Sequence, residues 1–397
     1  MQADFHYYAT YSAAFLAGFS HEESIEIAYS AQFVDLCSKT LLNKIKAPTA
    51  AATTQLQLEM MDMRTDIPGL LEITRIWASF HFLPYDLNAK LKWHSKLYMD
   101  KYRLMCNPNG ALVAKTVELA KKAGTGDATE NSAKASTGDI AENDAKKAGG
   151  YNYEAIGIAM HVLADTWAHR YFVGTPSYVM NNTDNDFYEV TDGAERKINF
   201  VHVPGIPDNL DKNKFTNSIH QSKERTVMNL GHGRAGHLPD YSFISYRYIP
   251  AWNNYETITK NNPEDYYKAF CQMVYAMKYL RGDIAEFELD TYAYETVEQY
   301  KDDIMNIIKI RQLIASDDWK LFGEKLSGEK IPDWNTEKYQ EEYIYAATSE
   351  KNNTLIGNFT AAAINHKKMV TEEIFNSGNM LAGISIRRPK VKVKKNK

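Results

Sequence analysis

The sequence predicts an all-α protein, and three observations lead to that prediction. Apolar residues recur at the i, i+3, i+4 spacing of an amphipathic helix over much of the chain. Strong helix formers (Ala, Leu, Met, Glu and Lys) fill these stretches, and Gly and Pro are few within them. Runs of alternating apolar and polar residues, which would indicate strands, are scarce. We therefore expect a large helical domain with long loops.

The boundaries of the first helices can be read from the sequence. Residues 4–17 are expected to form a helix that ends at Gly18. Ser20 and Glu23 have the spacing of a capping box, which predicts a second helix over 21–38. Apolar periodicity predicts further helices at 52–62, 68–79, 88–105, 110–122, 152–171, 264–282, 295–315, 336–347 and 354–376.

Composition divides the chain into parts. Residues 1–260 are expected to form the helical domain that carries the functional site, with two interruptions. Residues 121–150 are a low-complexity insertion with almost no large apolar residue, in which a short segment is imperfectly duplicated, so we interpret it as a mobile surface loop. Residues 174–260 are long loops rich in Pro, Gly, Asn and Asp.

Residues 261–380 are predicted to be helices that complete the bundle or form a second lobe. Their apolar periodic positions are interpreted as core: Tyr275, Met277, Leu280, Ile304, Ile307 and Ile308. Residues 381–397 form a basic tail, which is either a solvated end or a segment drawn to anionic surfaces.

Charge and cysteine content exclude several classes of protein. The formal net charge of −4 on 397 residues predicts no general attraction to nucleic acid. Cys37, Cys106 and Cys271 are odd in number and far apart, so we expect buried thiols and not a disulfide framework. No signal peptide or membrane span is visible, which predicts a cytoplasmic protein, with leaderless secretion as the alternative. No obligatory protein partner is evident.

The strongest functional signal is the segment with His161, Asp165 and His169. Spacings of four and eight residues place these side chains within about 80° on one face of a helix. The surrounding residues are apolar, so the polar stripe must be satisfied inside the protein. Imidazole nitrogen and carboxylate oxygen are ligands for zinc, iron and manganese, which favours a metal site over a plain hydrogen-bonded network.

Three other residues repeat this theme. His6 begins an apolar helix, Asp35 ends one, and His81 is flanked by large apolar residues. An isolated carboxylate at Asp35 would be costly unless it were paired or ligated. For His81 alone, a hydrogen-bonded core histidine is the simpler interpretation.

A fourth segment, residues 231–240, combines glycines with ligand-type side chains. His232, His237 and Asp240 are candidate ligands, and Asp240 or His237 is alternatively the catalytic acid or base. Arg234 is a candidate stabiliser of phosphate charge, although a surface arginine in a loop is the simpler interpretation.

Taken in order, these motifs resemble the zinc-dependent phospholipase C family and the related zinc-dependent single-strand nucleases. The chain opening and the His232 to Asp240 segment more closely resemble an uncharacterised bacterial family that is a distant branch of that group. The resemblance implies an all-helical fold around two or three zinc ions, with manganese or iron as alternatives. It implies ligands at His6, Asp35, His81, His161, Asp165 and His169.

The sequence departs from that family in two places. The family's last ligand pair is His-x-x-x-Glu on a helix, whereas this chain offers His232, His237 and Asp240 in a glycine-containing loop. The family also ligates metal with a free N-terminal amine exposed by removal of a leader, and no leader is visible here, so Met1 is expected to lie free. One, two or three metal ions remain open.

A metal-dependent hydrolase of phosphoesters is the predicted function. Two ions about 3.5–4 Å apart would activate a water and clamp both oxygens of a phosphoester. A lipid, a nucleic acid and a small phosphoester all remain candidate substrates, and the tyrosines of 241–256 would either line a cleft or belong to the core.

Two interpretations other than a hydrolase are also considered. A non-enzymatic binding protein would use the cluster as a closed structural metal site or a buried polar network. A di-iron oxidase would show Glu-x-x-His pairs, where this chain has His-x-x-x-Asp.

Overall fold

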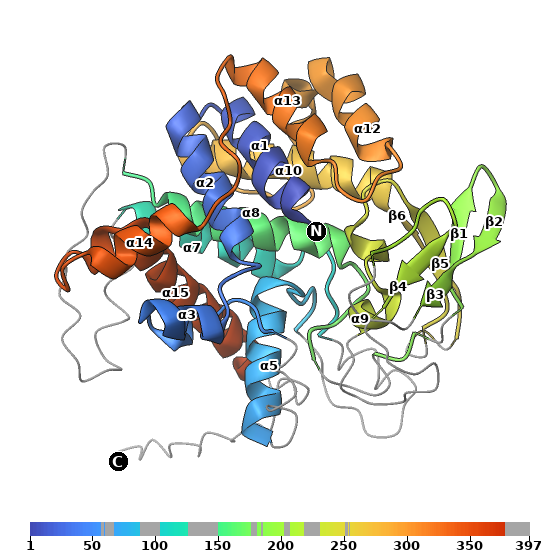
Figure 1. The fold of residues 1–397 in the computed structure, drawn as a ribbon, viewed down its shortest axis with the longest axis horizontal. Coiled ribbons are helices and arrows are strands. Elements are labelled where there is room, and N and C mark those ends of the chain that lie inside the picture. The colour runs from blue at the N-terminus through green and yellow to red at the C-terminus, as the bar shows by residue number, and fades with distance from the viewer. Residues whose placement is uncertain are drawn as a thin grey trace, which may run out of the picture.

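The computed structural model describes residues 1–56, 59, 67–87, 104–125, 150–175, 181–183, 186–201, 207–217, 231–250, 253 and 255–377. Helices surround a buried central helix, α8 (Tyr153–Ala168), and a small sheet lies beyond one end of it (Figure 1). The other described helices are η1 (Asp4–Ala9), α1 (Thr10–Leu16), α2 (His21–Phe33), α3 (Lys39–Ile45), η2 (Thr49–Ala51), α5 (Ile67–Phe80), α7 (Ala111–Thr125), α9 (Gly231–Ala235), η4 (Leu238–Asp240), α10 (Asn262–Arg281), α11 (Tyr294–Val297), η6 (Glu298–Tyr300), α12 (Lys301–Lys309), α13 (Ser316–Ser327), α14 (Glu337–Tyr345), η7 (Lys351–Asn353) and α15 (Leu355–Asn376). Among these residues no helix combines the length and apolar character needed to cross a bilayer.

Helix α8 is the centre of the molecule, because every one of its residues is buried. It begins where the side chain of Asn152 accepts a hydrogen bond from the amide of Ala155 (2.8 Å). Gly157 lets α8 approach α2 closely: a Cβ at this position would lie 2.5 Å from the carbonyl oxygen of Ile27. The two helices are therefore in backbone contact near the residues that carry the polar stripe.

The N-terminal helices follow the prediction with one correction. A π-helix, η1, runs directly into α1, and Gly18 ends the pair with φ of 97°. The capping box of Ser20 and Glu23 is confirmed. Helix α2, however, ends at Phe33 and does not continue to residue 38. Ser38 instead begins the separate helix α3, where its side chain accepts a hydrogen bond from the amide of Leu41 (3.2 Å). Asp35 consequently lies in a turn after α2.

The two ends of the described chain share one hydrophobic core. The Phe5 ring lies 5.0 Å from that of Tyr266 on α10 and 5.9 Å from that of Trp319 on α13, between ring centroids. Asp4 accepts a hydrogen bond from the amide of Ala315, where α13 begins (2.9 Å). The predicted core positions in the C-terminal helices are all buried: Tyr275, Met277, Leu280, Ile304, Ile307 and Ile308.

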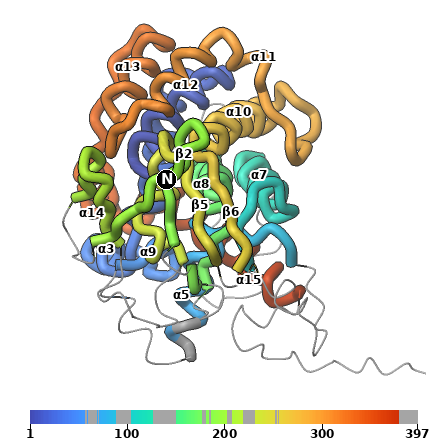
Figure 2. The backbone as a smooth tube through the Cα atoms, turned by 90° about the vertical axis from the view of Figure 1, so that its right-hand side faces the viewer, coloured from blue at the N-terminus to red at the C-terminus, as the bar shows by residue number. Residues whose placement is uncertain are grey.

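The prediction of a purely α-helical fold is wrong, because residues 188–261 contain short strands. They are β1 (Tyr188–Thr191), β2 (Ala194–Lys197), β3 (Asn199–Val201), β4 (Lys214–Thr216), β5 (Ser245–Tyr248) and β6 (Ile258–Asn261). Four of them form an antiparallel sheet in the order β2-β1-β5-β6, and β3 pairs with β4 in parallel. In Figure 2, which is turned by 90° from the view of Figure 1, this sheet faces the viewer.

The sheet was missed because its strands are only three or four residues long, too short for alternation to be recognised. In β5 the pattern is nevertheless present: Tyr246 and Tyr248 are buried and pair with β6 residues in the register Tyr246↔Lys260 and Tyr248↔Ile258. These tyrosines belong to a second hydrophobic core beneath the sheet. The interpretation of this tyrosine-rich segment as core therefore holds at these two positions.

Other helix predictions had mixed outcomes. The helices expected at 4–17, 68–79, 110–122, 152–171, 264–282, 336–347 and 354–376 are confirmed to within a few residues. The helix expected at 295–315 is broken into α11, η6 and α12, and α3 and α13 were not predicted. Residues 52–56 are not helical, and the rest of the 52–62 prediction, apart from residue 59, lies outside the described residues. Most of the 88–105 helix, residues 126–149 of the insertion and the basic tail also lie outside them.

Candidate metal centre

Polar side chains from five separate segments meet at the C-terminal half of α8. His161 and Asp165 lie on α8 and His169 directly follows it, as the helical spacing predicted. Two neighbouring groups result. The first cluster comprises His6, Asp35, His81, His161 and Asp165; the second cluster comprises His169, His232 and Asp240.

Asp165 is the hub of the first cluster. Its Oδ1 lies 3.2 Å from Nε2 of His6, and its Oδ2 lies 3.2 Å from both Nδ1 of His81 and Nε2 of His161. The side chain is buried, and burial alone would raise the pKa of its carboxyl group. The neighbouring imidazoles and a buried amine outweigh that effect and hold the pKa of Asp165 well below its usual range. Asp165 is thus an anion in the interior.

Backbone carbonyls fix the tautomers of two histidines in the first cluster. His161 donates from Nδ1 to the carbonyl oxygen of Ala31 (2.8 Å), and His81 donates from Nε2 to that of Thr53 (3.0 Å). A carbonyl oxygen only accepts, so in the neutral rings the proton sits on the outer nitrogen of each. The two inner nitrogens, 3.4 Å apart, therefore face each other with lone pairs and no hydrogen between them.

Neither ring nitrogen of His6 makes a hydrogen bond of good geometry among the described residues, although the residue is completely buried and Nε2 lies 3.2 Å from Oδ1 of Asp165. Its ring stacks on that of His161, with centroids 3.8 Å apart. Burial, followed by the positive neighbours, lowers the pKa of His6 to about 4, so the ring is neutral at physiological pH. An unsatisfied neutral imidazole beside a carboxylate and other lone pairs is an arrangement that a cation would complete.

The second cluster is held in the same way. His169 donates from Nδ1 to the carbonyl oxygen of His81 (2.7 Å), which turns its Nε2 toward Oδ1 of Asp240 (3.3 Å). Nε2 of His232, from α9, lies 3.4 Å from the same oxygen. Burial lowers the pKa of His169 to about 4, although Asp165 opposes that shift. The side chain of Asp240 is 10% exposed, and its partial burial would raise its pKa, but His232 and the nearby amine hold that pKa well below the usual range.

The N-terminal amine of Met1 joins the two clusters, which corrects the expectation that it lies free. It donates to Oδ1 of Asp165 (2.8 Å) and lies 3.3 Å from Oδ1 of Asp240, and Met1 is a buried residue. Burial would lower its pKa, but Asp165, Asp240 and Asp35 raise it to about 11. The described structure thus places a positive charge between the two carboxylates.

The donor chemistry of both clusters fits divalent metal ions. Three sets of donor atoms lie within 4.8 Å of one another: His6 with Asp35 and His161, His81 with His161 and Asp165, and His169 with His232 and Asp240. Imidazole and carboxylate donors suit zinc, and also manganese or iron. The outer nitrogens held by carbonyls match the second-shell pattern typical of metal-binding histidines.

Two residues open the centre to solvent. The side chain of Asp35 is 32% exposed, and Oδ1 lies 3.8 Å from Nδ1 of His81. His237 is 58% exposed and lies 3.6 Å from Asp240 between Nδ1 and Oδ2, outside the three donor sets. The adjacent carboxylate of Asp240 raises the pKa of His237. The cluster residues are therefore not fully enclosed, and they border solvent at Asp35 and at His237.

Arg234 and the residues that sequence reasoning missed complete the description. Arg234 is buried in α9, so its interpretation as a surface arginine is wrong. The carbonyls of Ala31 and Thr53 carry no signal in the sequence, because tertiary packing alone brings them to the rings. For the Met1 amine, the only signal was the resemblance to enzymes that use a terminal amine.

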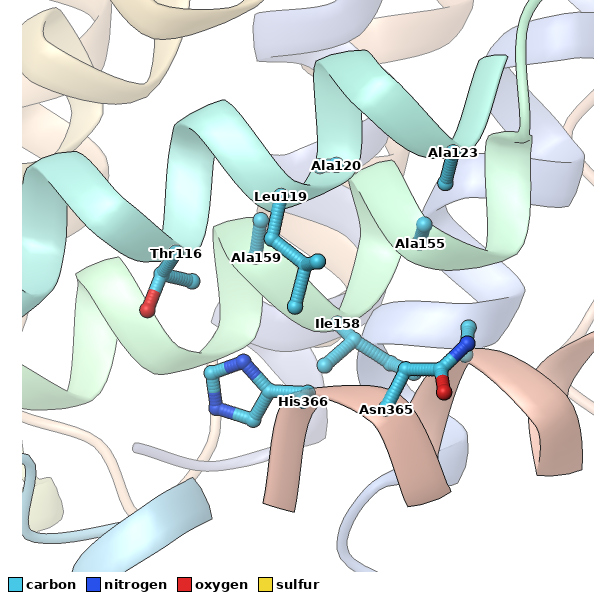
Figure 3. Close-up of a pocket in the computed structure, with 10 residues that line it drawn as sticks. Thr116, Leu119, Ala120, Ala123, Ala155, Ile158, Ala159, Asn365 and His366 are labelled. Atoms are coloured by element: carbon cyan, nitrogen blue, oxygen red, sulfur yellow. The ribbon is translucent and has the colours of Figure 1, made fainter. Parts of the chain in front are cut away.

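A pocket elsewhere has a different character. It lies between α7, α8 and α15 and is lined mainly by apolar residues, with His366 at one side (Figure 3). None of the metal-centre residues lines it. This pocket is therefore separate from the candidate metal centre.

Comparison with known proteins gives one match. A protein-family model described as "Family of unknown function (DUF6765)" matches residues 1–374. Neither the curated proteins nor the solved structures contain a match to the chain.

Proposed function

The chain belongs to the family of unknown function DUF6765, and from the geometry of its two clusters we propose that it is a metal-dependent hydrolase of phosphoesters. One observation carries the proposal. His81, His161 and His169 each donate from one ring nitrogen to a backbone carbonyl and turn the other, unprotonated in the neutral ring, inward. Such an arrangement of lone pairs around buried carboxylates supports cation binding.

The chain's residues divide the work. His6, Asp35, His81, His161 and Asp165 would hold ions at the first cluster, and His169, His232 and Asp240 at the second. Bound divalent ions supply Lewis acidity and lower the pKa of a coordinated water. Asp165, between the clusters, is placed to serve both.

Charge supports a phosphoester as the substrate class. Asp35, Asp165 and Asp240 are the carboxylates of the clusters, and two divalent ions would more than neutralise them. A site with surplus positive charge favours an anionic group and the negative charge that develops during its hydrolysis. His237, exposed beside Asp240, is positioned to exchange a proton with a leaving group.

Exposure favours an enzyme over a structural metal site. Structural zinc is enclosed by four protein ligands, whereas the Asp35 side chain is about one-third exposed. The resemblance to zinc-dependent phospholipases and nucleases agrees with this proposal.

The test measures metal content and hydrolysis together. Wild type is compared with the double variant His161→Ala, Asp165→Ala by elemental analysis, and both are assayed with a chromogenic phosphodiester. We expect two or three equivalents of zinc, manganese or iron in wild type and loss of both metal and turnover in the variant. His21→Ala is the matched control, since the His21 ring forms a hydrogen bond with the hydroxyl of Tyr11 and belongs to neither cluster.

Two outcomes would contradict the proposal. Protein that has never met a chelator and holds no metal, and takes up none, would leave the clusters as a buried polar network. Metal without turnover of any phosphoester tested would indicate a structural metal in a binding protein.

A further inference from the structure

A buried lysine lies at the end of the helix that carries the metal-centre residues. Lys260 belongs to β6, and its side chain has no exposed surface. Its ammonium donates to the carbonyl oxygen of Trp167 (3.1 Å) and to that of Ala168. These are the last two carbonyls of α8, immediately before His169.

The remaining carbonyls at this end of α8 are also satisfied. The amide of His169 donates to the carbonyl oxygen of Asp165 (2.8 Å), and the thiol of Cys106 lies 3.9 Å from that of Thr166. Helix ends normally leave such carbonyls to solvent or to a cap. Here the only charged donor to them among the described residues is Lys260.

The chain is held on the far side of His169 as well. Arg170 forms an ion pair with Asp265 at the start of α10 (3.4 Å), and Asp265 lies 3.8 Å from Lys260. The residues just before and just after His169 are thus tied to the same pair of charged groups. His169 itself has left helical geometry, with φ of −90° and ψ of 13°.

A buried ammonium is costly unless it is hydrogen-bonded or paired with an opposite charge. Burial also lowers the pKa of Lys260 to about 8, despite the opposing effect of Asp265. An apolar residue would avoid that cost but would leave the carbonyls of Trp167 and Ala168 without a donor. The position of the Lys260 ammonium indicates that it fixes the direction of the backbone as the chain enters His169.

We propose that Lys260 is a positioning residue: with Asp265 it fixes the end of α8 and so aims the imidazole of His169 at the second cluster. This inference rests on the proposed metal site but adds a residue that touches none of its ligands' side chains. It predicts an effect confined to the second cluster, because the first cluster is held by Ala31, Thr53 and the body of α8.

The test is zinc titration of the full-length protein in competition with a chromophoric chelator. His232→Ala first identifies which binding step belongs to the second cluster. In Lys260→Met we expect that step to weaken about 10- to 100-fold, the usual effect of losing an outer-shell partner, while the other step keeps wild-type affinity. Asp265→Asn removes the negative charge that pairs with Lys260 and Arg170, and it is expected to weaken the same binding step. This variant replaces Lys260→Met in the test if Lys260→Met does not fold.

Arg281→Met is the matched control. Arg281 also donates to a carbonyl at a helix end, that of Ala17 after α1, and this helix end carries no candidate ligand. We expect its zinc affinities to equal those of wild type.

Three results would overturn the inference. Unchanged affinity at the second cluster in both Lys260→Met and Asp265→Asn would remove the positioning role. Equal weakening of both steps would show general destabilisation instead. A wild-type protein that binds no zinc would reject the proposed metal site itself, and the positioning role with it.

Discussion

Replacing Gly157 by alanine is expected to destabilise the protein, although alanine is the better helix former. A Cβ at this position would lie 2.5 Å from the carbonyl oxygen of Ile27 and 2.6 Å from Cβ of Ser30. Neither atom is the end of a flexible side chain. Helix α2 as a whole must therefore move away from α8.

The sizes of two opposing effects decide whether Gly157→Ala stabilises or destabilises the protein. Alanine gains up to about 1 kcal/mol over glycine in a helix interior. Overpacking a close-packed interior costs about 1–3 kcal/mol, and a backbone obstacle belongs at the upper end of that range. We expect a net loss of about 1–2 kcal/mol in the free energy of unfolding. The shift would also carry Ala31, whose carbonyl orients His161, so zinc affinity at the first cluster should fall.

Urea unfolding of the metal-free protein measures this change. Gly323→Ala is the control, because a Cβ there would first meet Cδ1 of Ile331 (2.6 Å), the movable end of a side chain, and its cost should be smaller. A Gly157→Ala protein as stable as wild type would refute the argument that backbone contact fixes the spacing of α2 and α8.

Three further outcomes follow from the structure. Burial lowers the pKa of His366 to about 4 from an ordinary 6.5, so the unfolded chain takes up a proton that the folded protein does not. The contribution of His366 to stability should therefore fall as pH drops from about 6.5 to about 4, by at most about 3 kcal/mol, and His366→Gln should make the pH dependence less steep by that share in urea titrations across the same range. Asn262→Ala removes the two 2.8 Å hydrogen bonds that its amide donates to the carbonyls of Leu238 and Tyr241, so thermal or urea unfolding should show a loss of about 1–3 kcal/mol, and an unchanged midpoint would exclude their role in holding η4. Chelation of bound zinc should lower stability by about 3–4 kcal/mol relative to protein in free zinc at 100 to 1,000 times Kd, whereas identical unfolding curves would mean that no zinc site exists in the folded state.

The polar stripe on α8 was predictable because helical periodicity is a local property. His161, Asp165 and His169 needed only their own spacing to be placed on one face. The partners of these side chains were not predictable in the same way. Ala31 and Thr53 act through their carbonyls, which every residue possesses, so only the packing of α2 and of residues 52–56 against α8 selects them.

The errors have physical causes of the same kind. Lys260 was predicted to lie in a long loop, where a lysine is expected to be exposed. Its burial was not predicted, because it depends on a sheet whose strands are too short to produce a periodic signal in the sequence. For Arg234, a surface arginine in a flexible loop was the simpler interpretation, but the residue is buried in the short helix α9. Asp35 was placed on a helix, and the separate cap at Ser38 moved it into a turn.

The contacts of the chain start also determine when the site can be assembled during protein synthesis. The Met1 amine meets Asp165 across 164 positions, and Asp4 meets Ala315 across 311. A ribosome delivers these partners one after another, so η1 must wait, without its native neighbours, until most of the chain has emerged. His6 reaches its place only then, and under the proposed function a metal ion would bind after residue 315 has been synthesised rather than before.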